Sequence, residues 1–144
     1  MSRYLAIDPG TKRTGLAVGD DETGQAGPVQ TVEVSDPEQL LRRIAEAIED
    51  HAPDALVVGI PFNMDGTEGP AAKRARALVM LLQQHTGLPV HPVDERLSSY
   101  EADQRMAGSG WTRAQKKQRR DAIAAVVLLE IFLASRQNDP PDPS

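Results

Sequence analysis

The stretch that decides the fold is "YLAIDPGTKRTGLAVGDD", residues Tyr4 to Asp21. Two largely apolar runs, 4–7 and 14–19, flank a turn that contains Gly10. Apolar runs joined by such a turn predict a β-hairpin. The first run ends in a carboxylate, Asp8. The hairpin therefore carries an acid at the end of a strand that belongs to the core. The question is whether Asp8 has a structural role in the turn or a functional role together with other residues.

The residues after the hairpin alternate between strand and helix signals. Alternation over 28–34 predicts a third strand. A helix then begins in "SDPEQL", where Asp36 can cap, Pro37 suits the first turn, and Ser35 with Glu38 has capping-box spacing. After Pro53, the run "DALVVGIP" (54–61) is almost continuously apolar, as expected of a central parallel strand.

The C-terminal half continues the alternation. We predict a helix from Pro70 to Thr86, a strand over 88–95, and a short helix over 98–108 in which Ser98 and Glu101 form a capping box. A long final helix over 112–135, in one or two pieces, follows. We expect one domain over residues 1–134 and a disordered, polar, Pro-rich tail over 135–144.

This order of elements predicts an α/β fold. Three antiparallel strands followed by alternating helices and strands give a mixed five-stranded sheet with helices on both faces. The order matches the ribonuclease H-like fold, although other α/β folds share it.

Composition limits the function classes. A length of 144 residues suits one domain, and the lack of cysteine excludes disulfides and thiolate metal sites. The net charge of −5 argues against a protein that coats nucleic acid but permits a local basic face. We find no signal peptide and no membrane-spanning stretch, so we expect a cytoplasmic protein without membrane partners.

Four acids stand where they could meet. Asp8 ends the first strand, Asp94 and Glu95 end the fifth, and Asp121 lies on an otherwise apolar stripe of the final helix. Carboxylates that meet at a sheet edge repel one another, and a divalent cation removes the conflict. Oxygen ligands select Mg²⁺ or Mn²⁺, and one or two such ions can cleave a phosphodiester. The sequence thus offers a candidate metal site.

Each acid also has a structural interpretation. Asp8 could accept hydrogen bonds from the turn amides at 10–11, and Asp94 could cap the following helix. Asp121 could be a partly exposed acid beside Arg120. The hairpin could also bind phosphate, as in sugar kinases and actin-like ATPases, but those proteins need two such lobes.

Four blocks resemble a known family. They are "AIDPGTKRTGLAVGD", "VVGIPFNMDGTEGPAA", "VDERLSSYEA" and "RRDAIAAVVLLEIFL". Together they resemble the YqgF family, also called RuvX, over residues 3 to about 134. The members are Holliday-junction-resolvase-like proteins described as nucleases of the 16S rRNA precursor.

The resemblance implies the ribonuclease H-like fold, a cytoplasmic location and maturation of the 5′ end of 16S rRNA. By motif match it implies Asp8, Glu95 and Asp121 as catalytic residues and metal ligands, with Asp94 as the alternative to Glu95. The implied cofactor is Mg²⁺ or Mn²⁺, as one or two ions.

Two positions depart from the expected pattern. In the true resolvases the fourth strand ends in a catalytic Glu, whereas here it ends Gly59-Ile60-Pro61. The strand-five acid would have to replace that Glu. Arg120 stands directly before Asp121, where the family usually has an apolar residue.

A local cationic surface accompanies the acids. "TRAQKKQRRD" makes the start of the final helix basic, and further cations flank the other acids. Phosphate binding beside the metal site and a merely solvated helix face are both consistent with it. The candidate nucleic-acid-binding residues are Lys12, Arg13, Arg96, Arg113, Lys116, Lys117, Arg119 and Arg120, with Lys73, Arg74 and Arg76 as a possible extension. Since only 3% of residues are aromatic, we expect recognition of shape and phosphates.

The loop "NMDGTEG" (63–69) is either a mobile loop near the site or a structural turn.

Two functions of different class remain open. The first is a metal-dependent nuclease on structured nucleic acid, with the 16S rRNA precursor preferred over a four-way DNA junction. A junction enzyme cuts two symmetry-related strands and needs a homodimer, whereas an rRNA nuclease can be a monomer. The second is a non-catalytic module that binds rRNA or a ribosome-associated factor.

Overall fold

A computed structural model describes residues 1–10, 12–33 and 36–137 of the chain. The strands are β1 (Arg3–Pro9), β2 (Thr14–Asp20), β3 (Ala26–Val32), β4 (Ala55–Ile60) and β5 (Val90–Asp94). The helices are α1 (Pro37–His51), α2 (Pro70–Thr86), α3 (Arg96–Ala107) and α4 (Arg113–Gln137). The predicted order of elements is confirmed.

The five strands form one mixed sheet in the order β3-β2-β1-β4-β5. β1 and β2 pair antiparallel, as do β2 and β3, whereas β1, β4 and β5 run parallel. The carboxyl ends of three parallel neighbours therefore share one edge. Asp8 pairs with Gly15 near the end of β1, and Asp94 pairs with Ile60 at the end of β5. The predicted acids of these two strands therefore lie at the same edge of the sheet.

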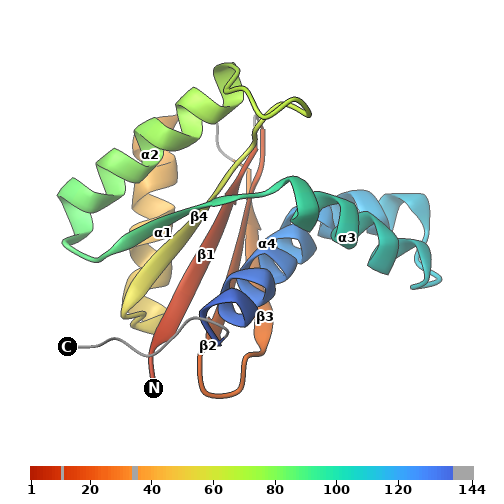
Figure 1. The fold of residues 1–144 in the computed structure, drawn as a ribbon, viewed down its shortest axis with the longest axis horizontal. Helices are drawn as coiled ribbons and strands as arrows, with labels where there is room; N and C mark the ends of the chain where they lie inside the picture. Colours follow the sequence, from red (N-terminus) through yellow and green to blue (C-terminus); the bar gives the residue numbers. More distant parts are fainter. Residues whose placement is uncertain (11, 34–35, 138–144) are drawn as a thin grey trace.

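Helices cover both faces of the sheet (Figure 1). Side chains alternate along β1: Leu5 and Ile7 enter a core with α1 and α2, while Tyr4 and Ala6 pack with α4 on the other face. All residues of β4 are buried, as its continuous apolar sequence requires. α3 packs on the outside of α4 through a small third cluster. The predicted α/β architecture, a mixed five-stranded sheet with helices on both faces, is confirmed.

Local signals fix most boundaries. Asp36 caps α1 by accepting a hydrogen bond from the Glu38 amide at 3.2 Å, as predicted. The capping box proposed for Ser35 and Glu38 involves Ser35, which lies outside the described residues. Gly87 ends α2 with a left-handed φ of 69°.

The last two helices differ from their predicted form. α3 begins at Arg96, so the proposed capping box of Ser98 is wrong: its hydroxyl donates to the Glu95 carbonyl oxygen at 2.7 Å, within the first turn. α4 is one helix that continues to Gln137, past the predicted domain end at residue 134. The Arg136 guanidinium lies 5.5 Å from the centre of the Phe132 ring, and a cation in the last turn is favoured by the helix dipole. The rest of the predicted tail, 138–144, lies outside the described residues.

The fourth helix is the longest, and none of the helices in the described ranges is long and apolar enough to cross a membrane.

Candidate active site

Asp8 sits near the end of β1 with only 9% of its surface exposed. Burial raises the pKa of Asp8 well above its ordinary value. A side-chain hydrogen bond with Glu95 and the charges of Glu95 and Asp121 raise the pKa further, and Arg120 opposes the shift. A divalent cation bound between these acids would relieve the same repulsion.

Glu95 follows β5 and turns back over β4. Its Oε2 atom lies 2.8 Å from the position that a β-carbon on Gly59 would occupy. This oxygen is buried and has no hydrogen-bond partner among the described residues. A buried, unpartnered carboxylate oxygen is costly in a folded protein unless a ligand completes it.

Asp121 approaches Asp8 because α4 packs directly on the hairpin. A β-carbon at Gly15, the pairing partner of Asp8, would collide with the backbone carbonyl oxygen of Asp121. Glycine at this position thus permits the helix to lie close to the acid-bearing strand. Burial raises the pKa of Asp121, while the charges of Arg13 and Arg120 lower it.

Asp8, Glu95 and Asp121 line one pocket of about 130 Å³. Ser99 and Ala102 of α3 form another part of its wall. In the described ranges, no three His, Asp or Glu side chains form a group with the geometry to hold a metal ion at once. The donor set is nevertheless all carboxylate, and Glu95, which has one buried oxygen without a hydrogen-bond partner, lines the pocket, so the chemistry fits a hard divalent cation. The charges of Glu95 and Asp121 both act on Asp8, and all three acids line this pocket.

Asp94 is directed elsewhere. Its carboxylate pairs with the Arg96 guanidinium at 2.6 Å and accepts a hydrogen bond from the Arg96 amide at 3.0 Å. The hydrogen bond from Arg96 holds the pKa of Asp94 below its usual value. Asp94 therefore caps the first turn of α3, which is its structural interpretation, and does not line the acid pocket.

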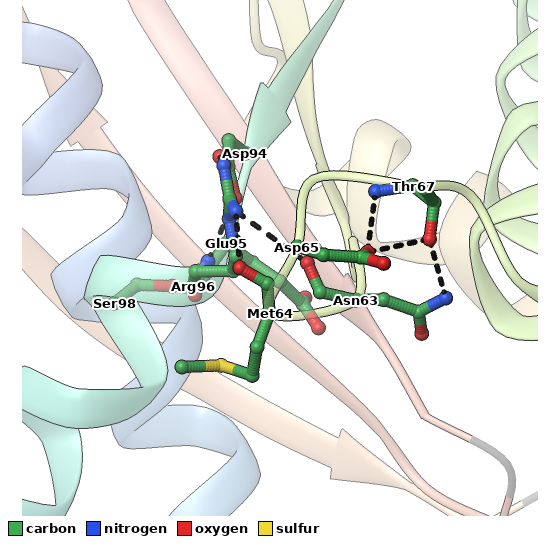
Figure 2. A network of polar contacts seen from close by, with 8 residues as sticks. All are labelled: Asn63, Met64, Asp65, Thr67, Asp94, Glu95, Arg96 and Ser98. Atoms are coloured by element: carbon green, nitrogen blue, oxygen red, sulfur yellow. Dashed lines mark hydrogen bonds and ion pairs between the residues drawn. The ribbon is translucent and has the colours of Figure 1, made fainter.

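Arg96 joins this turn to the loop that follows β4 (Figure 2). Its Nη1 atom lies 3.4 Å from the carbonyl oxygens of both Asn63 and Met64. The loop is closed by its own bonds: the Asn63 amide donates to the Thr67 carbonyl oxygen, and the Thr67 amide donates to Asp65. These contacts match the structural-turn interpretation of the loop. Arg96 thus holds the segment that carries Glu95 through its contacts with Asp94, Asn63 and Met64.

A cationic pocket of about 340 Å³ adjoins the acid pocket and shares Arg120 and Asp121 with it. Lys12, Arg13 and Lys117 are its other charged residues. Arg13 donates to the Lys117 carbonyl oxygen at 3.1 Å, which ties the hairpin turn to α4. Two segments far apart in sequence thus place positive charge beside the acids.

The remaining predicted cations lie along α4 and differ in their contacts. Arg120 pairs with Asp103 of α3 at 3.0 Å, so the residue that departs from the family pattern bridges the two helices. Arg119 lies over the Trp111 ring at 4.5 Å. Arg113 and Lys116 line a third pocket together with Lys117 and Arg120. Of the proposed extension, Arg76 pairs with Glu68, and Arg74 lines an apolar groove between α1 and α2.

Four contributors were missed by the sequence analysis. Gly15 and Gly59 contribute because they lack a side chain, which leaves room for Asp121 and Glu95 to approach. Residue types and spacings do not reveal such close approaches between segments that are distant in the chain. Ser99 and Asp103 gain their positions from the way α3 packs on α4. The sequence held one signal for them: Glu95, Ser99 and Asp103 are each four residues apart, which places them on the same side of a helix.

Solved structures of the resolvase class have the same fold. Thermus thermophilus RuvC in complex with a Holliday junction substrate superposes with a TM-score of 0.63 at 17% identity, over 94% of this chain and 96% of that one. Fowlpox virus resolvase with junction DNA gives a TM-score of 0.57 at 11% identity, over 93% and 98%. These likenesses define the chain as a protein of the ribonuclease H-like fold, with an acid-lined pocket at the edge of its sheet.

Sequence relatives narrow the class to a family. A family described as "RuvX: Holliday junction resolvase" matches residues 2–135. Relatives with the provisional name of pre-16S rRNA nuclease are 41% identical in Anaeromyxobacter sp. (93% of this chain, 98% of the relative) and 38% identical in Escherichia coli (89% and 93%). A Geobacillus relative of that name is 38% identical over 94% of this chain and 99% of its own length. The chain belongs to the RuvX family.

Proposed function

We propose that this protein is a divalent-metal-dependent nuclease that trims the 5′ end of the 16S rRNA precursor in the cytoplasm. The observation that carries the proposal is the pocket at the sheet edge, where Asp8, Glu95 and Asp121 lie beside a cationic surface. A pocket of acids alone would repel a polyanionic strand, whereas acids beside cations suit a phosphodiester and its metal. The names of the bacterial relatives supply the substrate.

Asp8 and Glu95 would hold Mg²⁺ or Mn²⁺, as one or two ions, with Asp121 as a further ligand. When bound, such a cation activates water for attack on phosphorus and stabilises the departing oxygen. Lys12, Arg13 and Lys117 would bind the backbone phosphates next to the scissile one.

Arg120 has a separate role in this scheme. Its guanidinium is fixed by Asp103 at 3.0 Å and lines both the acid pocket and the cationic pocket. Its charge opposes the rise in the pKa of both Asp8 and Asp121, and so favours the ionised forms that bind metal. Arg120 thus offsets the repulsion between acids and substrate.

The test compares substrates directly. Precursor 16S rRNA and a synthetic four-way DNA junction are incubated side by side with Mn²⁺ and with chelator, and Glu95→Gln serves as the control for contaminating nucleases. We expect Mn²⁺-dependent cleavage of the rRNA that the variant lacks. Binding without cleavage under all conditions would instead favour the non-catalytic rRNA or ribosome-factor module.

A four-way DNA junction is the second candidate substrate, because the family description names that activity. Paired cleavage of a junction needs two copies of the site. Faster cleavage of the junction than of rRNA, by a dimer, would replace the rRNA proposal; a monomer that cuts only rRNA supports it.

A further inference from the structure

A third groove lies where the C-terminal end of α3 meets the N-terminal half of α4. Its volume is about 350 Å³. Met106 and Ala107 of α3 give it a largely apolar wall. Arg113, Lys116, Lys117 and Arg120 of α4 form the opposite, cationic side. The groove lacks the carboxylates that define the metal-binding pocket, except for Asp103, whose charge is paired with Arg120.

The four cations follow one face of the helix. Positions 113, 116, 117 and 120 are separated by three and four residues, which brings their side chains to the same side of α4. Within the described ranges, Arg113, Lys116 and Lys117 form no ion pair with an acid, unlike Arg120. Their charges are therefore available to an anion from outside the chain.

The groove continues from the proposed active site. Lys117 and Arg120 line both this groove and the cationic pocket beside Asp121. Arg120 also lines the acid pocket. A nucleic-acid strand with one phosphate at the acids can thus extend over Lys117 and Arg120 into the groove. Its backbone would stay beside positively charged side chains along this path.

The combination of an apolar wall and free cations identifies the ligand class. A surface that bound phosphates alone would need no apolar wall, and one that bound an apolar side chain would not need several unpaired cations. A nucleotide presents both features, because its base is a flat apolar face and its backbone carries charge. Arginine guanidinium groups also stack on base planes, so Arg113 can serve where aromatic residues are scarce.

We propose that this groove is a nucleotide subsite that holds one unstacked base of the RNA strand being cut. The base lies against Met106 and Ala107, and its flanking phosphates contact Arg113, Lys116 and Lys117. This inference rests on the proposed nuclease function. It adds that the substrate is single-stranded for at least the nucleotide that enters the groove, because a paired base could not leave its stack at no cost.

The test is an abasic scan. Short RNAs, each with one abasic nucleotide at a different distance from the mapped cleavage position, are bound to the full-length protein in chelator, and affinity is measured by anisotropy. For the wild type, we expect one position at which loss of the base weakens binding by about 5- to 20-fold. Ala107→Glu places a charge on the exposed wall residue, so it should weaken binding of intact RNA and abolish the difference at that position.

Gln118→Glu is the matched control, because it adds the same charge at an exposed position of α4 outside the groove. It should leave the abasic profile unchanged. A flat profile for a wild type that binds and cuts RNA would overturn the subsite while leaving the nuclease proposal intact. A wild type that neither binds nor cuts RNA would overturn both.

The single tryptophan, Trp111, reports on an alternative occupant because it lies two residues before Arg113. Titration with RNA should change its fluorescence in the wild type and change it less in Ala107→Glu. A response to poly-glutamate but not to RNA would assign the groove to an acidic protein partner and overturn the proposal.

Discussion

The carboxylate of Glu95 occupies the space that a side chain on Gly59 would fill. Its Oε2 atom lies 2.8 Å from the position of a β-carbon built on Gly59, and its own β-carbon lies 3.2 Å from the same point. Gly59 stands near the end of β4, at the strand end where the resolvase pattern in the sequence analysis led us to expect a Glu. The acid from the β5–α3 junction thus reaches the region that an acid on the fourth strand would serve. This relationship gives a physical reason for a glycine at the end of β4.

The first prediction follows from that contact. Gly59→Ala should move the Glu95 carboxylate, because the end of a flexible side chain yields more easily than a strand. We expect a stability loss of about 1 kcal/mol and a fall in metal-dependent cleavage of about tenfold or more. Gly27→Ala, on β3 with no atom within 4 Å of the new β-carbon, is the matched control for glycine replacement in a strand. Full activity in Gly59→Ala would show that the position of Glu95 is unimportant.

The second prediction separates the two adjacent acids. Glu95→Gln should reduce metal-dependent cleavage by about 100-fold or more and remove the stabilisation of the protein by Mn²⁺. Asp94→Asn should keep that stabilisation, because Asp94 is paired with Arg96 outside the pocket. Thermal melts with and without Mn²⁺, together with cleavage rates, check both variants. The reverse pattern would reassign the ligand to Asp94.

The third prediction concerns the stability of Asp8→Asn in chelator. If Asp8 serves to hold metal among other acids, the amide relieves like-charge repulsion and raises the free energy of unfolding at pH 7 by up to roughly 1 kcal/mol. If Asp8 mainly caps the turn, the same change should lower it by roughly 1 kcal/mol. Among the described residues no backbone amide donates to Asp8, whereas the Thr11 amide lies outside them. A lower melting temperature for the variant in chelator would support the turn cap.

The fourth prediction uses pH. The pKa of Asp8 is raised in the folded protein, so the native state binds its proton more tightly than the unfolded chain does. The stabilising effect of that proton is complete below the ordinary carboxyl pKa and is lost as pH rises through the raised value. The advantage of Asp8→Asn over the wild type, measured in chelator, should therefore shrink as pH is lowered from 7 toward 4. An advantage that grows on acidification would contradict the raised pKa.

The fifth prediction concerns the cations of α4. Lys116→Ala combined with Lys117→Ala should weaken RNA binding and reduce the slope of log affinity against log salt by about 1.5, because each phosphate contact on a single strand contributes about 0.7. Arg119→Ala should change the slope less, since its guanidinium lies over the Trp111 ring. Equal slopes for the double variant and the wild type would make this surface a solvated helix face only.

The sequence by itself determined the order of elements and the edge at which the acids gather. Hydrophobic period and helix capping are local signals, so β1, β4 and α1 could be located without tertiary contacts. The position of Asp8 at a strand end also follows from local pattern. Because parallel strands present their carboxyl ends at one edge, the approximate meeting of Asp8 with the β5 acids followed as well.

Only the tertiary structure decided which side chains enter the pocket. Asp94 and Glu95 are adjacent, and their directions depend on the turn into α3, which the contacts of Arg96 with the loop help to hold. The predicted capping role of Ser98 was wrong for the same reason. The turn after β5 is so short that α3 begins at Arg96, and Ser98 lies inside its first turn. Gly15 and Gly59 act through backbone and side-chain approaches between segments far apart in the chain. Such contacts depend on how the layers pack, and packing has no local signature in sequence.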